Sequence, residues 1–415
     1  MKSESSLIQP SAETQRRFDW LEAAHLKKIV AALEKAAPGG NRFVGGCVRD
    51  SLFAVAPKDF DLATVLPPED VVRALTSAGL KYAPTGLAHG TVTAIAEHQG
   101  VEVTTLRKDV STDGRRATVA YTDDWAIDAA RRDFTINAIY LTPQGLLFDP
   151  VNGLTDINVR RVQFIGDAET RIREDYLRIL RFFRFSARFA ETFDEAGLAA
   201  CKTLSGGLSQ LSAERIGAEF MAILSLPRPG AVLKAMAAAG VLEKVWSSGS
   251  KPEAVARLKA LAPHAPAPIA LAALFSDAGD GIESALRLSN AEGALRKRAL
   301  AGLSQIKRGL TEKAVRALIY RLGRDGFADA VALAGAFQRI DRTEYERLTS
   351  ILDQWLPPVF PASGKDVVAL GIEKGPAISA ILEAAEKQWI EEDFPEVSRV
   401  KAILKESAAA FAGLV

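Results

Sequence analysis

The chain has 415 residues, 48% hydrophobic and 25% charged, which is typical of a globular protein with about two to four structural units. This composition excludes a disordered or collagen-like chain, and two cysteines are too few for a disulfide framework or a cysteine zinc site. With 52 basic and 51 acidic residues, the net charge of +1 does not indicate an anionic partner. The polar N-terminus and the lack of a membrane-length apolar run predict a cytoplasmic protein.

The predicted elements divide the chain near residue 155. Before it, helices are expected over 18–36 and 68–78, and short β-branched runs predict strands at 42–44, 59–65, 91–96, 101–106, 117–121 and 135–141. After residue 170, Ala- and Leu-rich segments of helical period dominate. The sequence therefore predicts an α+β fold, with a head built on an antiparallel or mixed sheet and an all-α remainder.

A Gly-Gly turn followed by two aspartates carries the strongest local signal. Alternate residues of a strand share a face, so Asp59 and Asp61 are expected to present two carboxylates side by side, an arrangement that suits Mg²⁺. Gly45 and Gly46 are expected to expose backbone N–H groups to phosphate oxygens, with Arg49 one turn further along a helix. An isolated Asp-x-Asp is common on strand surfaces, but the combination predicts a metal-dependent nucleotidyl-transfer site.

Glu102 is a candidate third carboxylate near the metals. It alternates with apolar residues in the expected strand at 101–106. Such a strand also places polar residues outward for no catalytic reason, so this second interpretation stays open.

The segment from residue 174 to 185 is predicted to be a base-reading helix. Asp175 and Arg178 are three residues apart and share a face, which Arg181 and Arg184 continue. A carboxylate accepts hydrogen bonds and a guanidinium donates them, which matches the amino group and ring nitrogen of cytosine and of adenine. Uracil and guanine present the reverse pattern, so the pair would reject them. The alternative is an arginine-rich helix that binds phosphates or its own acids.

Four further motifs follow in the order of one known family. They occupy residues 131–138, 149–156, 174–185 and 211–216. With the Gly-Gly and Asp-x-Asp stretch, they resemble the class II tRNA nucleotidyltransferase (CCA-adding enzyme) and bacterial poly(A) polymerase family of the polymerase-β-type nucleotidyltransferase superfamily. The resemblance covers roughly residues 18–245.

The resemblance implies a polymerase-β-like head at 1–153, a helical neck at 154–245, and a helical body and tail at 246–415 that bind tRNA. It implies that Arg132 contacts the triphosphate and Asp133 the ribose. The expected activity is template-independent addition of CCA to the 3′ end of tRNA from CTP and ATP, with Mg²⁺ as cofactor. No role with DNA or a membrane is expected.

The alternatives are poly(A) addition and partial, A-adding or CC-adding, activity. The stretches at 107–116 and 84–91 resemble a full CCA-adding enzyme, and the Gly-Arg-Arg-Phe element usual in bacterial poly(A) polymerases is absent from the sequence. Two other hypotheses are a catalytically inactive RNA-binding protein and an enzyme that transfers nucleotides to a small molecule.

Two basic zones point to a polyanion. Residues 171–188 hold six arginines, and residues 296–324 hold nine basic residues against Glu312 alone. In the second zone, Lys307, Arg308 and Lys313 are the candidates to bind the acceptor arm of tRNA. A solvated helix face is the simpler alternative.

Overall fold

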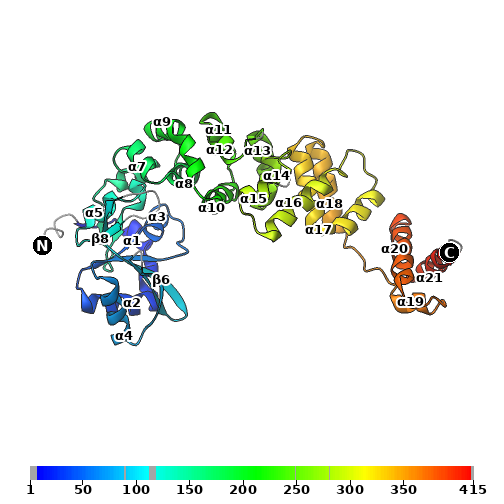
Figure 1. The fold of residues 1–415 in the computed structure, drawn as a ribbon, viewed down its shortest axis with the longest axis horizontal. Coiled ribbons are helices and arrows are strands. Elements are labelled where there is room, and N and C mark those ends of the chain that lie inside the picture. The colour runs from blue at the N-terminus through cyan, green and yellow to red at the C-terminus, as the bar shows by residue number, and fades with distance from the viewer. Residues whose placement is uncertain (1–6, 88–89, 112–117, 248, 280, 413–415) are drawn as a thin grey trace. The chain divides into compact units, whose positions relative to one another are not determined.

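The computed structural model describes residues 7–87, 90–111, 118–247, 249–279 and 281–412 (Figure 1). The chain divides into two compact units, Met1–Leu226 with Val232–Ser247 (unit 1), and Pro227–Ala231 with Ser248–Val415 (unit 2). Residues 112–116 of the loop expected at 107–116 lie outside the described residues. Within the described ranges, no helix is both long enough and apolar enough to span a membrane.

A mixed eight-stranded sheet forms the head of unit 1, in the strand order β1-β10-β9-β2-β3-β6-β5-β4. Its strands are β1 (Leu7–Ile8), β2 (Asn41–Val44), β3 (Asp61–Thr64), β4 (Lys81–Gly86), β5 (Thr91–Ala96), β6 (Gln99–Thr105), β9 (Tyr140–Leu141) and β10 (Leu147–Phe148). The β3–β6 pair is parallel, and the other described pairs in this sheet are antiparallel. A separate hairpin joins β7 (Arg107–Ser111) and β8 (Thr118–Tyr121). The expected α+β head is confirmed.

The two faces of the sheet bury different partners. Helices α2 (Ala24–Ala36) and α4 (Pro68–Ser77) pack beside each other against it (Figure 1). Phe43 of β2 contacts Trp20, whereas its neighbour Val44 packs on the opposite face with Trp125 and Tyr140. The smaller elements of the head are α1 (Ala12–Arg16), η2 (Asp19–Glu22), α3 (Gly46–Leu52), α5 (Trp125–Ala130) and η4 (Thr135–Asn137).

Helices complete unit 1 after the sheet. They are α6 (Gly153–Asn158), α7 (Ala168–Glu174), α8 (Leu177–Phe189), α9 (Glu195–Leu204), η5 (Ser205–Gln210), α10 (Ala213–Leu224), α11 (Gly230–Ala238) and α12 (Val241–Val245), the first two residues of α11 belonging to unit 2. Buried phenylalanines attach α8 to the head: Phe182 stacks on Phe164 at 5.4 Å, and Phe185 meets Phe134 edge-on at 5.4 Å. This packing sets which arginines of α8 face the head.

The regular secondary structure in the described part of unit 2 consists of helices. It contains α13 (Pro252–Leu261), α14 (Ala267–Leu274), α15 (Gly281–Ala285), α16 (Asn290–Leu303), α17 (Glu312–Ala336), α18 (Arg342–Gln354), α19 (Gly364–Val368), α20 (Pro376–Glu391) and α21 (Val397–Ala412). Gly323, with φ 72°, breaks α17 into two stretches. Trp389 and its apolar neighbours in α19–α21 form a small core that packs against Tyr320 of α17.

Two expected strands are wrong in their extent. The strand predicted at 59–65 begins only at Asp61. Its partner there is Val44, the last residue of β2, because Gly45 has a φ of 76° and turns the chain out of the sheet. Asp59 therefore lies in a bend outside the sheet. The strand predicted at 135–141 is instead a 3₁₀ turn, η4, followed by the two residues of β9.

The base-reading helix is also not one helix. Helix α7 ends at Glu174, Asp175 has an extended backbone (φ −155°, ψ 106°), and α8 begins at Leu177. The Asp175 side chain accepts a hydrogen bond from the Leu177 N–H, and this local bond competes with helix continuation. The Arg178 N–H still donates to the Asp175 carbonyl at 3.0 Å, so the two residues remain one turn apart.

Candidate active site

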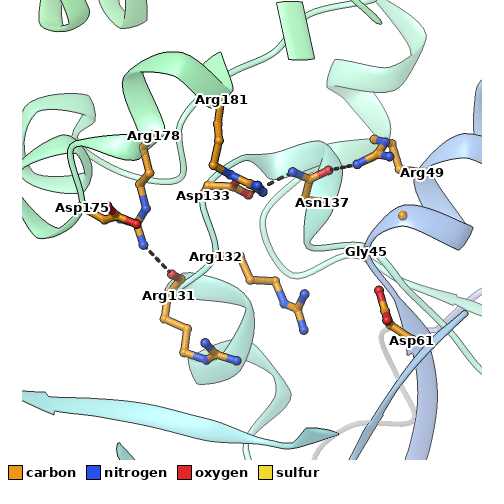
Figure 2. Close-up of a pocket in the computed structure, with 11 residues that line it drawn as sticks. Gly45, Arg49, Asp61, Arg131, Arg132, Asp133, Asn137, Asp175, Arg178 and Arg181 are labelled. Atoms are coloured by element: carbon orange, nitrogen blue, oxygen red, sulfur yellow. Dashed lines mark hydrogen bonds and ion pairs between the residues drawn. The ribbon is translucent and has the colours of Figure 1, made fainter. Parts of the chain in front are cut away.

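A cavity of about 360 Å³ in unit 1 brings together residues from both halves of that unit. This volume is within the roughly 300–1,000 Å³ typical of small-ligand pockets. Its lining is strongly charged and consists of Gly45, Gly46, Arg49, Asp61, Arg131, Arg132, Asp133, Asn137, Asp175, Arg178 and Arg181. In Figure 2, Asp175 and Arg178 lie at one side, Asp61 and Arg49 at the other, and Arg132 between them.

Gly45 closes the cavity where β2 turns into α3. Its positive φ of 76° is a conformation that favours glycine. A Cβ at Gly45 would lie 3.6 Å from a carboxylate oxygen of Asp61 and 4.0 Å from a guanidinium nitrogen of Arg132. The turn therefore places the backbone of Gly45 close to the Asp61 carboxylate and the Arg132 guanidinium.

Asp61 is the carboxylate that lines the cavity at its sheet end. Burial raises the pKa of Asp61 to about 6, and the nearby charges of Glu102 and Asp59 also raise it, while Arg132 and Arg49 act in the opposite direction. Glu102 is opposite Asp61 in the parallel β3–β6 register, on the same face of the sheet. Of these three carboxyls only Asp61 lines the cavity, whereas Asp59 and Glu102 are exposed.

These carboxyls fit a hard divalent cation better than a softer one. The described part of the chain holds no cluster of three or more acidic, histidine or cysteine side chains arranged as a metal cage. Mg²⁺ is commonly bound by one or two carboxylates together with water and substrate phosphates, so Asp61 with one acidic neighbour meets its needs. The raised pKa of Asp61 also favours a cation at this position, since a cation would offset the repulsion of the Asp61 carboxylate by Glu102 and Asp59.

The predicted phosphate and ribose contacts line the cavity, but each has a protein partner. Arg49 is buried and donates to Asn137 at 2.7 Å and to Asp50 at 2.6 Å. Arg132 donates to the buried Asp128 at 3.1 Å, and Asp133 accepts from Arg181 at 2.6 Å. Pairing of this kind offsets the cost of removing charges from water.

The expected base-reading pair lines the other side of the cavity. Asp175 accepts one hydrogen bond from the Leu177 N–H at 3.1 Å and one from Arg215 at 2.7 Å. A carboxylate has about four acceptor positions, so Asp175 keeps capacity for a ligand amino group. Arg178 donates to Glu174 and to the Arg171 and Arg131 carbonyls, at 2.6, 2.8 and 3.2 Å. These bonds use three of its five N–H groups, so Arg178 also keeps donors.

Arg184 is not among the residues that line the cavity, so its role as a nucleotide contact stays a prediction without support from the lining. It is ion-paired with Glu219 of α10 at 2.6 Å and lies over the Phe185 ring. Arg181 does line the cavity, and it is bonded to Asp133. The predicted row of cavity-lining residues along α8 ends at Arg181, because the next arginine, Arg184, is ion-paired with Glu219 of α10.

Sequence reasoning missed two lining residues, Arg131 and Asn137. Both lie in the motif at 131–138, where only Arg132 and Asp133 were singled out. The η4 turn brings Asn137 back over Asp133, to which it donates at 2.9 Å. Because a strand was expected at 135–141, and residues four apart in a strand lie far from each other, no sequence signal placed Asn137 beside Asp133.

Several basic residues of the zone at 296–324 are ion-paired in the fold with acids that lie outside this zone. Arg296 is buried and pairs with Glu283, Arg308 with Asp341, and Arg316 with Asp393, all acids from other segments of unit 2. Lys307 and Lys313 are exposed. Lys297, Arg298 and Arg321 are exposed as well, so the zone keeps accessible positive charge, and its role in tRNA binding stays a prediction.

Comparison with known proteins identifies relatives along most of the chain. A family model described as the "Poly A polymerase head domain" matches residues 41–163, and one described as the "Probable RNA and SrmB- binding site of polymerase A" matches residues 192–248. The mouse protein named "CCA tRNA nucleotidyltransferase 1, mitochondrial" is 34% identical over 362 residues, covering 84% of this chain and 82% of the relative. The "CCA-adding enzyme" of Leuconostoc citreum is 41% identical over 184 residues, covering 44% of this chain and 45% of the relative.

Solved structures agree with these relatives. The Bacillus stearothermophilus CCA-adding enzyme in complex with CTP superposes with a TM-score of 0.72 at 25% identity, covering 94% of this chain and 99% of that one. The Thermotoga maritima enzyme complexed with tRNA has the same fold, with a TM-score of 0.66 at 18% identity over 93% of this chain and 95% of its own.

The raised pKa of Asp61 predicts a pH-dependent stability. The neutral carboxyl is favoured in the folded state, so its contribution is present below the ordinary value of 3.8 and is lost as the pH rises through about 6. Without divalent metal, Asp61→Asn should raise the free energy of unfolding by about 1–3 kcal/mol at pH 8 and change it little at pH 4. Urea unfolding at both pH values measures the difference, and a variant no more stable than wild type at pH 8 would contradict it. Added Mg²⁺ should stabilise only the wild type at pH 8.

Proposed function

The chain belongs to the family of CCA-adding enzymes and poly(A) polymerases, and from this premise we propose that it adds CCA to the 3′ end of tRNA, using CTP and ATP and releasing pyrophosphate. The observation that carries the proposal is the cavity that combines Asp61 with the Asp175–Arg178 pair. It supplies, in one place, a cation-binding carboxylate and two side chains that match the edge shared by cytosine and adenine.

We propose Mg²⁺ as the cofactor, held by Asp61 and Asp59, with Glu102 close enough to add to their charge. When bound, Mg²⁺ would activate the RNA 3′-hydroxyl and stabilise the leaving pyrophosphate. Asp59 lies outside the cavity lining, and the effect of its charge on the pKa of Asp61 supports assigning both residues to one cation.

The remaining residues bind and orient the nucleotide. The N–H groups at Gly45 and Gly46, together with Arg132, would hold the triphosphate. Asp133 stays the predicted ribose contact, and because its two oxygens already accept from the Phe134 N–H, Asn137 and Arg181, a ribose hydroxyl would displace one of these donors. Arg49 is held against Asn137 and adds positive charge at the same end of the cavity. In-line attack by the RNA hydroxyl on the α-phosphorus then needs no covalent enzyme intermediate.

We propose that the helical remainder holds tRNA by charge and shape, since duplex RNA offers little readable sequence. This includes the proposed neck at 154–245 and the body and tail at 246–415. Cytoplasmic location stays a prediction, because the mouse relative is named as mitochondrial.

The direct test uses a tRNA transcript that lacks its 3′ CCA, incubated with each nucleotide alone and with CTP plus ATP. We expect two cytidines from CTP alone and one terminal adenosine when ATP is added. Asp61→Ala or Asp59→Ala should abolish transfer without loss of tRNA binding, because both act on the cation and neither is in the core. Long adenylate tails from ATP alone would favour poly(A) addition, and failure of the wild type to transfer any nucleotide would favour an inactive RNA-binding protein.

Base selection makes a second prediction. Asp175→Ala removes the acceptor for the amino group of cytosine and adenine, and also the repulsion of the uracil and guanine carbonyls. Efficiency with CTP and ATP should fall and UTP or GTP incorporation should appear, with discrimination reduced roughly 5- to 150-fold. The measurement is kcat/KM for the four nucleotides on the truncated tRNA.

Arg178→Ala is the control for this prediction. It removes a donor and relieves no repulsion, so it should lower correct incorporation without gain for UTP or GTP. An equal loss for all four nucleotides in Asp175→Ala would show that Asp175 acts only on structure or phosphate position.

The basic zone makes a third prediction. Replacement of the exposed Lys307 and Lys313 by Ala should weaken tRNA binding and reduce the slope of log K against log salt by about 1 to 2, since fewer counterions are released. Arg308→Ala should add less, because Arg308 is already paired with Asp341. CTP affinity should not change.

A matched control removes the same charge from the head. Lys35 and Lys81 are exposed lysines of α2 and β4. Their replacement by Ala should leave tRNA affinity and its salt slope unchanged. If replacing Lys35 and Lys81 changes tRNA affinity and its salt slope as much as replacing Lys307 and Lys313, the zone at 296–324 is only a solvated surface.

A further inference from the structure

Asp128 is a buried carboxylate close to the cavity, but it is not one of the residues that line the cavity. It lies in α5, its side chain is 1% exposed, and α5 leads directly into Arg131 and Arg132. A carboxylate at this depth is stable only when its charge and its lone pairs are matched. Its partners therefore indicate what it is for.

Both oxygens of Asp128 are occupied by donors from the head. One accepts from the Arg131 guanidinium at 2.7 Å and from the Arg107 backbone N–H at 3.3 Å. The other accepts from Arg132 at 3.1 Å and from the Tyr140 hydroxyl at 2.8 Å. Asp128 therefore has little capacity left for a substrate, and any effect it has on the reaction must pass through these groups.

Arg132 is the partner that faces the substrate end of the cavity. Its guanidinium lies over the Tyr140 ring at 5.4 Å, and a nitrogen of the same group approaches Gly45 (Figure 2). Its Nε is buried without a hydrogen-bond partner. The hydrogen bond that Arg132 donates to Asp128, together with the contact to the Tyr140 ring, therefore orients the Arg132 side chain toward the Gly45 turn.

The charge balance points the same way. Burial by itself raises the pKa of Asp128, but the charges of Arg132 and Arg131 and the bond from Tyr140 outweigh it and hold this pKa below its usual range. Asp128 is therefore ionised at neutral pH. One carboxylate shared by two guanidiniums leaves about one positive charge facing the cavity, which suits a nucleoside triphosphate.

We propose that Asp128, with Tyr140, is a positioning residue that holds Arg132 for the triphosphate, so that it controls affinity for every nucleotide and not the choice of base. The inference rests on the proposed function, since it takes the ligand of Arg132 to be a nucleoside triphosphate. It assigns Asp128 a role distinct from that of Asp175, which acts on the base.

The test is a double-mutant cycle between Asp128→Asn and Arg132→Ala, with CTP and ATP binding measured by calorimetry in the absence of RNA. Asp128→Asn should weaken CTP and ATP binding by the same factor, about ten- to a hundredfold, because it removes a charge-assisted contact to Arg132. In the Arg132→Ala background, the same substitution should change binding less than about threefold, because its target is gone. Additive effects, or different losses for CTP and ATP, would overturn the proposal.

Two further variants guard against a trivial loss of structure. Tyr140→Phe keeps the ring and deletes only the hydroxyl bond, so it should weaken nucleotide binding by a smaller factor that also vanishes with Arg132→Ala; this cycle decides the question if Asp128→Asn does not fold. Glu283→Gln removes the carboxylate partner of the buried Arg296 in unit 2 and should lower the melting temperature without changing CTP affinity. A wild-type protein that binds neither CTP nor ATP would overturn the proposed function together with this inference, whereas additive cycles in a nucleotide-binding wild type would overturn the inference alone.

Discussion

The cavity is organised by pairs of guanidinium and carboxylate groups that are largely removed from water. Arg49 is paired with Asp50, Arg132 with Asp128, and Arg181 with Asp133. A buried charge that loses its partner is strongly destabilising, so these pairs restrict where each side chain can lie. The cavity is therefore rigid in its charged groups before a substrate arrives, which is the condition for electrostatic binding without reorganisation.

Asp61 is the exception to this pairing. Its neighbours include two acids, and burial raises its pKa to about 6. Every other acid that lines the cavity accepts hydrogen bonds from an arginine, Asp133 from Arg181 and Asp175 from Arg215. The ionised form of Asp61, which lacks such an arginine, is thus the one that a bound cation would stabilise most.

The sequence predicted an α+β head on an antiparallel or mixed sheet and most of the lining residues, partly from local patterns and, for Arg132 and Asp133, from the family resemblance. Gly45 needs a positive φ wherever the strand turns into the helix, and the alternation at Asp61 follows from strand geometry. The extent of β3 could not be read in the same way. Whether Asp59 is paired depends on where β2 ends, and that is set by Gly45, fourteen residues earlier in the chain.

Long-range partners explain the other errors. The break at Asp175 is supported by Arg215 from α10, and Arg184 is drawn away from the cavity by Glu219 of the same helix. Counting charges within the zone at 296–324 likewise omitted acids from distant segments, such as Asp341 and Asp393. In each case the local pattern identified the residue type correctly, but its partner came from a segment that the pattern did not cover.

The two ends of the cavity are joined through the backbone between them. Arg178, from the base-reading side, donates to the Arg131 carbonyl (Figure 2). The Arg131 side chain in turn shares Asp128 with Arg132. A displacement of Arg178 therefore acts on the peptide next to Arg132 without passing through solvent. Because buried polar networks of this kind have few alternative arrangements, the backbone between the two motifs is held in one position relative to Arg178 and Arg132. Arg131 and Arg178, from separate motifs, thus line a single cavity and are bonded to each other within it.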